Sequence, residues 1–522
     1  MAQPFQQLPY LSYGLLVLGI YVVYRILRIG RRDPRMPKGP PTLPILGNFH
    51  QIPSTGMYRQ FREWAKEYGP VFSLKFGPSN IIVLSDREAI HELIDKKGSI
   101  YSDRPTTYVG NLLTRGDHIA ISPADSLWRE KRKVIAHNFS PKMLDEKHFR
   151  VQEAEGIVLM NDLLNHPDGF FNHIRRYTAS VAATLVYGQR GATFDSFWGH
   201  AVYDVMTKWT ECMEPGANPP VDEYPILKYI PKNLALWKRR ALRAGDTMDA
   251  VWTRARQIIE ARRAKGDKRD CIADRLLDEY NEKGFPMSQH AFNNLIGELV
   301  EGGADTTSAQ LLTMVLALAR NPWVQEKARK EIDPLCGSSR SPQWSTDFQS
   351  LPYINAIVKE GMRWRPVVRQ DDYYKGMLIP KDSTIFIPTW AIHHNPEIYP
   401  NDEDFNPDRF LNYPKLASEY AGSANWKDRD KSKATPSKAS KAERNMWRIT
   451  SKLLWAFDIR EPVDPVTGKT IPLDPTAYNP GITQAPLPFK VRITPRSPEH
   501  AAVLRKEYRA ALDFLAPFES NE

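Results

Sequence analysis

The residues best suited to chemistry lie in the middle of one long apolar segment. The run LIGELVEGGADTTSAQLLTMVLALA has the apolar spacing of a helix, yet Gly302, Gly303, Asp305 and Thr306 interrupt its centre. A glycine inside a helix costs about 1 kcal/mol relative to alanine, so the pair needs a compensating role. Two glycines let a flat ligand approach the backbone, and a buried acid beside a hydroxyl can relay protons to it. Taken alone, the motif is equally typical of a helix-packing glycine pair with a capped aspartate.

A second group of residues combines one acid with two arginines. Glu360 and Arg363 stand three residues apart in KEGMRW, a spacing that places them on one helix face within ion-pair distance. Arg409 follows in FNPDRF, after about 45 residues. A Glu-x-x-Arg pair by itself is most often a pair on the surface of a helix.

The order of these motifs is more specific than any one of them. WREKR, with Trp128 and Arg132, precedes the glycine pair, and the acid and arginines follow it, behind an apolar N-terminus and a Pro-rich lead. In this order the chain resembles the cytochrome P-450 family of haem-thiolate monooxygenases over nearly its whole length. The lead, RWRP and IHHNPEIYPNDEDFNPDRF resemble the fungal, membrane-anchored branch of that family.

The resemblance implies a mainly α cytochrome P-450 fold, a large helical domain with small β-sheets, and haem b as the cofactor. Trp128 and Arg132 match the helix that hydrogen-bonds a haem propionate. Gly302 and Gly303 match the distal helix over the iron.

The same resemblance implies roles for the remaining motif residues. Asp305 and Thr306 occupy the proton-delivery positions for splitting bound dioxygen. Glu360, Arg363 and Arg409 match a buried structural trio beneath the haem, in which two guanidinium groups offset the desolvation of one carboxylate.

The axial ligand of the family is missing from the expected place. It is a cysteine in a loop Phe-x-x-Gly-x-Arg-x-Cys-x-Gly just before the last long helix, and its thiolate donates electron density toward O–O cleavage. Counting back from Ala442 puts it at 434–436, within KATPSKASK, which contains neither cysteine nor histidine. Cys212, Cys271 and Cys336 lie elsewhere in the sequence and are not expected to replace it, so no metal ligand is assigned.

The N-terminus predicts a membrane anchor. Residues 8–24 are uncharged and close to the roughly 20 apolar residues that a span requires, and four arginines follow within the next eight residues. A basic cluster on this side places the globular part in the cytosol, and the resemblance implies the endoplasmic reticulum membrane. A cleaved secretory signal is less favoured, because no basic region precedes the run and no small-residue cleavage site follows it. We therefore predict an N-terminal transmembrane helix in residues 1–28, a basic and Pro-rich linker over 29–56, and a globular domain over 57–522.

Charge and cysteine content limit the classes of binding partner that are expected. The formal net charge is +10, and the basic run over 427–441 lacks the interleaved aromatic residues typical of a nucleic-acid surface, so no nucleic acid is expected. Three widely spaced cysteines predict neither a disulfide framework nor a zinc site. The resemblance implies a hydrophobic small-molecule substrate and electrons from NADPH through cytochrome P-450 reductase, whose acidic surface a basic face would attract.

Three interpretations of the missing ligand remain open. The first is a monooxygenase of fungal secondary metabolism whose sequence here derives from a mis-spliced or mis-predicted transcript. The second is a degenerate, non-catalytic, membrane-anchored binding protein. The third is a haem protein with an unexpected ligand or an open iron site.

Overall fold

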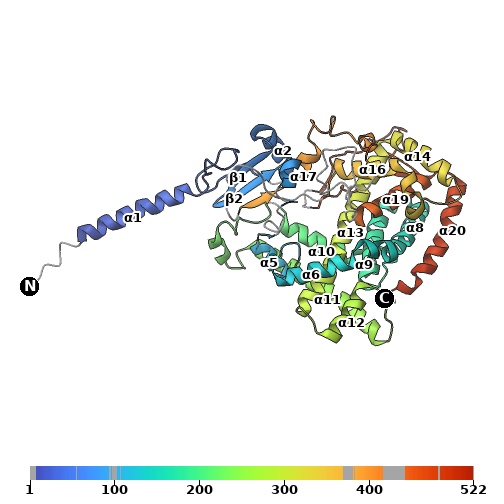
Figure 1. Cartoon of the computed structure of the whole chain (residues 1–522), viewed down its shortest axis with the longest axis horizontal. Coiled ribbons are helices and arrows are strands. Elements are labelled where there is room, and N and C mark those ends of the chain that lie inside the picture. Colours follow the sequence, from blue (N-terminus) through green and yellow to red (C-terminus); the bar gives the residue numbers. More distant parts are fainter. Residues whose placement is uncertain are drawn as a thin grey trace, which may run out of the picture. The chain divides into compact units, whose positions relative to one another are not determined.

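The structure is a computed structural model, and helices predominate in it (Figure 1). The residues that it describes are 8–53, 56–92, 96, 103–105, 107–214, 216–367, 380, 383–414, 441–479 and 483–520. The chain divides into two compact units. Unit 1 comprises Met1–Ser102, Pro219–Pro231 and Arg369–Ile392, and unit 2 comprises Asp103–Asn218, Lys232–Val368 and His393–Glu522.

Unit 1 contains a small sheet of three strands. The sequence predicts a helix, two strands and another helix here, and the structure confirms them as α2 (Met57–Tyr68), β1 (Val71–Phe76), β2 (Ser79–Leu84) and α3 (Arg87–Ile90). Strand β1 pairs antiparallel with β2, and β2 pairs parallel with β3 (Thr384–Phe386). The run YKGMLIPKDSTIFIP also predicts a β-rich stretch, which includes β3 and lies partly outside the described residues.

The Pro-rich lead is packed against this sheet. The guanidinium of Arg32 donates to the carbonyls of Gly39 (2.8 Å), Pro40 (2.9 Å) and Ser73 (2.8 Å), the last of which belongs to β1. A Cβ on Gly39 would lie 2.1 Å from the Ser73 carbonyl oxygen, so only glycine permits this approach. The lead is therefore part of the folded unit.

The segment expected to cross a membrane forms helix α1 (Leu8–Arg28). Within the part of the chain that the structure describes, however, no helix combines the length and apolar character of a membrane span. The prediction of a transmembrane helix in 1–28 is thus not supported. Its C-terminal half is too polar, since Arg25 and Arg28 donate to the hydroxyls of Tyr21 (2.8 Å) and Tyr24 (3.1 Å).

Unit 2 is built from helices and one strand pair. Strand β4 (Phe457–Arg460) pairs antiparallel with β5 (Arg492–Pro495), and β5 confirms the strand that the β-rich run PLPFKVRITP predicts. The helices are α5 (Tyr108–Thr114), α6 (Ser126–Asn138), α7 (Pro141–Met143), α8 (Phe149–Asn165), α9 (Phe170–Tyr187), α10 (Phe197–Met213), α11 (Leu236–Ala264), α12 (Ile272–Lys283), α13 (Gln289–Arg320), α14 (Pro322–Cys336), α15 (Trp344–Asp347), α16 (Pro352–Trp364), α19 (Lys441–Ala456) and α20 (Pro498–Leu515), with α17 (Thr389–His393) at the boundary between the units.

Helix α13 carries the motif and passes through both large apolar cores of unit 2. Its first half, from Phe292 to Ala304, packs with α9, α10 and α11, and its second half, from Leu311 to Ala319, packs with α16 and α19. Asp305 and Thr306 fall between the two cores and are only half-buried. The apolar packing on both sides stabilises the helix, so its centre can carry glycines and polar groups.

Candidate functional site

The two motif glycines of α13 are not a packing pair. A Cβ on Gly302 would meet no described atom within 4 Å, and one on Gly303 would make only an ordinary contact, 3.6 Å from the Cβ of Ala182. Gly297, one turn earlier, is different, because a Cβ there would lie 2.5 Å from the indole ring of Trp252. Gly297 thus serves packing, while Gly302 leaves one side of the helix open.

Asp305 and Thr306 lie within four residues of Gly302 on α13. Thr306 Oγ1 donates to the carbonyl of Gly302 at 3.0 Å, which keeps the hydroxyl against the helix. Burial raises the pKa of Asp305 to about 6, the positive charge of Arg175 on α9 opposes this, and Glu301 adds to it. Asp305 can therefore gain and lose a proton near neutral pH, as a proton-delivering group must.

Trp128 and Arg132 share one face of α6. Asp125 caps this helix by accepting the backbone N–H of Trp128 at 2.8 Å. The guanidinium carbon of the exposed Arg132 lies 5.6 Å from the centroid of the Trp128 ring. The structure brings these two residues together, as their spacing of four implies, but no described contact joins them to Gly302–Thr306.

Glu360 and Arg363 form a buried bidentate ion pair on α16. Arg363 Nε donates to Glu360 Oε2 at 2.7 Å and Nη2 donates to Oε1 at 2.8 Å. The remaining donors of Arg363 reach the carbonyls of His393 (2.9 Å), Asp402 (2.9 Å) and Asp404 (3.1 Å). The pair thereby ties α16 to the segment that follows α17.

Arg409 completes the group more loosely. Its Nε lies 3.5 Å from Glu360 Oε1, while its two Nη groups donate to the carbonyls of Pro400 (2.6 Å) and Asn401 (2.8 Å). The backbone N–H of Asn406 also donates to Glu360 Oε1, at 2.8 Å. The predicted trio thus surrounds the Glu360 carboxylate, and Arg363 contacts this carboxylate more closely than Arg409 does.

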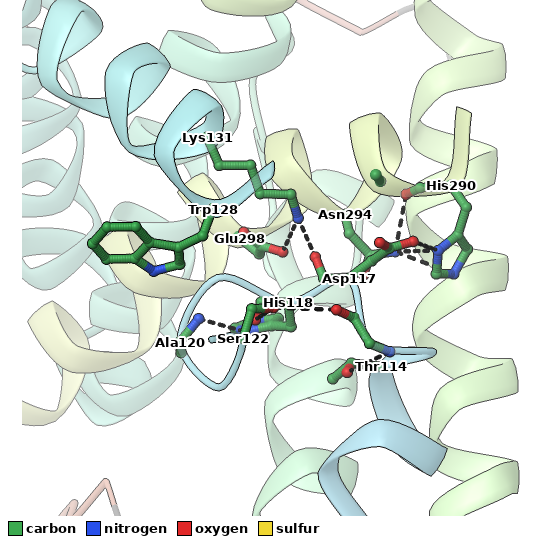
Figure 2. Close-up of polar contacts among 12 residues, drawn as sticks. Thr114, Asp117, His118, Ala120, Ser122, Trp128, Lys131, His290, Asn294 and Glu298 are labelled. Carbon is green, nitrogen blue, oxygen red and sulfur yellow. Dashed lines mark hydrogen bonds and ion pairs between the residues drawn. The ribbon is translucent and has the colours of Figure 1, made fainter. Parts of the chain in front are cut away.

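A buried polar cluster beside α13 was not anticipated from the sequence (Figure 2). Lys131 of α6 donates to Glu298 Oε1 at 3.1 Å and to the carbonyl of Asp117, whereas Trp128 on the same helix points away from the cluster. His118 contacts Glu301 Oε2 through Nε2 at 2.9 Å. Loop 115–122 is therefore bound to α6 and α13 by buried charges.

The outer end of this cluster is half-exposed. His290, at the start of α13, bridges Asp117 Oδ2 through Nδ1 (2.5 Å) and Asp249 Oδ1 through Nε2 (2.9 Å). The positions of Glu298 and Glu301 inside an apolar helix could have indicated a buried polar cluster, because charged side chains are rarely buried without partners. Nothing in the sequence indicates that their partners are Lys131 and His118.

The three cysteines lie away from the motif helices. Cys212 is near the end of α10, Cys271 caps α12, and Cys336 ends α14 with its Sγ 3.9 Å from Asp347 Oδ2. All three cysteines are free and buried. Burial raises the pKa of all three thiols, to about 12 for Cys271 and about 11 for Cys336, so they remain protonated at neutral pH.

These donors do not fit a thiolate-ligated haem. No described atom lies within 4 Å of a Cβ placed on Gly302, but none of the cysteines lies on α6, α13 or α19. The ligand position expected at 434–436 lies outside the described residues, and its sequence holds no cysteine.

One other group of possible metal ligands occurs among the described residues. Ligand atoms of His394, Asp402 and Glu403 lie within 4.8 Å of one another. Glu403 Oε2 is also 3.4 Å from Arg365 Nη1, and the backbone carbonyls of Asp402 and Glu403 accept from Arg363 and Trp364. The group is therefore already part of the framework around the trio.

Comparisons with known proteins agree with the motif order. The profile of the cytochrome P450 family matches residues 37–422 and so ends before the Lys-rich run that begins at Lys427. The chain is 38% identical over 515 residues to the cytochrome P450 monooxygenase patI of Aspergillus clavatus and 38% identical over 525 residues to macC of Penicillium terrestre, with 96% of both chains covered in each case. It is 39% identical over 518 residues to a cytochrome P450 monooxygenase of Arthrobotrys oligospora, with 95% of both chains covered.

The fold comparison points the same way. A solved structure of a zebra fish cytochrome P450 with abiraterone superposes with a TM-score of 0.63 at 22% sequence identity, covering 85% of this chain and 100% of that one. With a family profile over most of the chain and full-length relatives that share more than a third of its residues, this protein belongs to the cytochrome P450 family.

Proposed function

We propose that this protein derives from a monooxygenase that oxidises a hydrophobic small molecule in fungal secondary metabolism, and that the sequence as it stands does not support thiolate-dependent oxygenation. The observation that carries the first part is the centre of α13, where no described atom lies within 4 Å of a Cβ on Gly302 and burial raises the pKa of Asp305 to about 6. The fungal relatives, which are named monooxygenases, support it.

The second part of the proposal rests on the lack of a cysteine that could ligate the haem iron. In the family, a haem held by a cysteine thiolate supplies the activation of dioxygen, and this chain has no cysteine after Cys336. Trp128, Arg132, Asp305 and Thr306 remain, although only haem gives them a purpose in this family. An abrupt Lys/Ser/Ala run in place of one loop is what a wrong exon boundary produces, so a transcript or gene-model error explains both facts.

The competing function is that of a non-catalytic binding protein. The observation that favours it is the intact framework: the Glu360–Arg363 pair is fully formed and both apolar cores are closed around α13. Such a chain would fold and bind a hydrophobic molecule without redox chemistry.

Partners and location are part of the same proposal. Electrons would come from NADPH-cytochrome P-450 reductase, which the basic run over 427–441 would attract electrostatically. The globular part would work on the cytosolic side of the endoplasmic reticulum membrane, and the exposed aliphatic side chains of α1 support contact with lipid.

Sequencing of the expressed transcript tests the proposal. We expect a spliced message that encodes a Phe-x-x-Gly-x-Arg-x-Cys-x-Gly loop in place of the Lys-rich run. A message that encodes residues 427–441 as printed, translated into a stable protein, would overturn the transcript explanation in favour of the binding protein.

A further inference from the structure

We propose that unit 1 contains a binding site for a phosphate group, in which Arg32 and Lys38 of the Pro-rich lead contact the phosphate oxygens. The site is a cavity of about 270 Å³, several times the roughly 30 Å³ that one water molecule takes in the liquid. Arg32, Asp33 and Lys38 provide the charged groups of its lining, and Tyr68 at the end of α2 provides a hydroxyl. The motifs in the sequence include none of these residues.

The guanidinium of Arg32 has no acidic partner among the described residues. Its Nη groups donate to the carbonyls of Gly39, Pro40 and Ser73, so three of its five N–H groups are used. One of the remaining two is on Nε, which is buried and has no hydrogen-bond partner in the described chain. Burial lowers the pKa of Arg32, and Tyr68 opposes this shift. The positive charge of Arg32 is therefore only partly compensated.

A second cation inside unit 1 also lacks a carboxylate within the described part of the chain. Lys75 on β1 is 6% exposed, and its Nζ donates to the carbonyl of Pro78 and to Asn80 Oδ1, both at 2.7 Å. Burial and the positive charge of Arg32 both lower the pKa of Lys75. An oxyanion bound beside Arg32 would offset this excess of positive charge.

The carboxylates beside the cavity are already engaged. Arg35 donates to Asp33 through Nε (3.0 Å) and Nη2 (2.7 Å), and its backbone N–H donates to Asp33 Oδ1 at 2.9 Å. A hydrogen bond to Glu67 raises the pKa of Tyr68, so the Tyr68 hydroxyl stays protonated and neutral. Arg35 thus offsets the one negative charge in the lining, and the two cations remain.

Lys38 is held at the cavity by its backbone. The N–H of Ser73 donates to the carbonyl of Lys38 at 2.9 Å, and Ser73 Oγ donates to the carbonyl of Pro37 at 2.5 Å. The Lys38 side chain is exposed and makes no hydrogen bond or ion pair with a described residue. A phosphate can therefore accept charge-assisted hydrogen bonds from Lys38 and Arg32 without breaking an existing ion pair.

The test uses the full, haem-free chain and separates two sources of phosphate. Calorimetric titration with inorganic phosphate tests the free ion. Co-sedimentation with phosphatidylcholine vesicles, with and without phosphatidic acid, tests a phospholipid headgroup.

Lys38→Gln should weaken binding about tenfold, because it removes one charge-assisted contact and leaves the hydrogen bonds of Arg32 in place. Lys66→Gln is the matched control, since it removes an exposed lysine of α2 that does not line the cavity, and it should change binding less than about twofold. Asp33→Asn removes the negative charge of the lining and should strengthen binding.

Binding of inorganic phosphate that depends on Lys38 would support the site with the free ion as ligand. Binding only to vesicles that contain phosphatidic acid, with the same dependence on Lys38, would support it with a headgroup as ligand. The absence of binding in both experiments would overturn the proposal. Equal losses in Lys38→Gln and Lys66→Gln would overturn it as well, because they would indicate a general attraction to basic surface.

Discussion

Replacing Arg363 with alanine should destabilise unit 2 more than any other single change in the trio. The substitution removes both hydrogen bonds to Glu360, which is fully buried, and three hydrogen bonds to backbone carbonyls. Breaking a buried ion pair by removing one partner costs about 3–5 kcal/mol, since the remaining charge is left without compensation. At about 1 °C per kcal/mol for a unit of several hundred residues, the thermal midpoint should fall by about 3–5 °C.

Arg409→Ala is the matched control. Arg409 approaches Glu360 only at 3.5 Å and otherwise donates to two carbonyls, so its loss should cost about 1–2 kcal/mol. Both variants would be compared with wild type by scanning calorimetry at one scan rate and by urea unfolding. Equal losses for the two arginines, or a neutral Arg363→Ala, would show that the structure assigns the wrong partner to Glu360.

Further predictions concern glycine positions and pH. Gly302→Ala should stabilise the protein by about 0.5–1 kcal/mol, because alanine favours the helix and its Cβ meets no described neighbour. Gly297→Ala should destabilise it by about 1–3 kcal/mol, because its Cβ would collide with the Trp252 ring. Urea unfolding that ranks the two variants the other way would refute this. Burial lowers the pKa of His290, but Asp117 and Asp249 raise it more, so its folded-state pKa lies above the unfolded value near 6.5. The ion pairs of His290 with Asp117 and Asp249 should therefore stabilise the protein fully below pH 6.5, and less as the pH rises through the folded-state pKa. His290→Gln should reduce the dependence of the melting temperature on pH in this range. A dependence that His290→Gln leaves unchanged would contradict this prediction.

Helices and strands with strong periodicity were accessible from the sequence. The apolar spacing of α13 predicted that helix, and two β-rich runs in unit 1 predicted β1 and β2. The association of Glu360, Arg363 and Arg409 was also predicted, but only because motif order identified the family. Spacing alone favoured a surface pair.

The buried polar cluster beside α13 could not be predicted in the same way. His118, Lys131 and Glu301 come from a loop and two helices, and their association depends on how α6 packs against α13. No local pattern encodes such a contact. The prediction of a transmembrane helix rested on a count of uncharged residues, and among the described residues no helix has the length and apolar character of a membrane span.

The most direct test of the central claim is the reduced, CO-bound absorption spectrum of the full chain expressed in a haem-replete host, with haem content measured alongside. Matched variants would carry a single cysteine at 434, 435 or 436, with serine at the same position as the control. We expect no long-wavelength Soret band of thiolate ligation from the chain as printed or from the serine variants. Such a band from the printed chain would show that Cys212, Cys271 or Cys336 reaches the iron, and would contradict our account of the missing ligand.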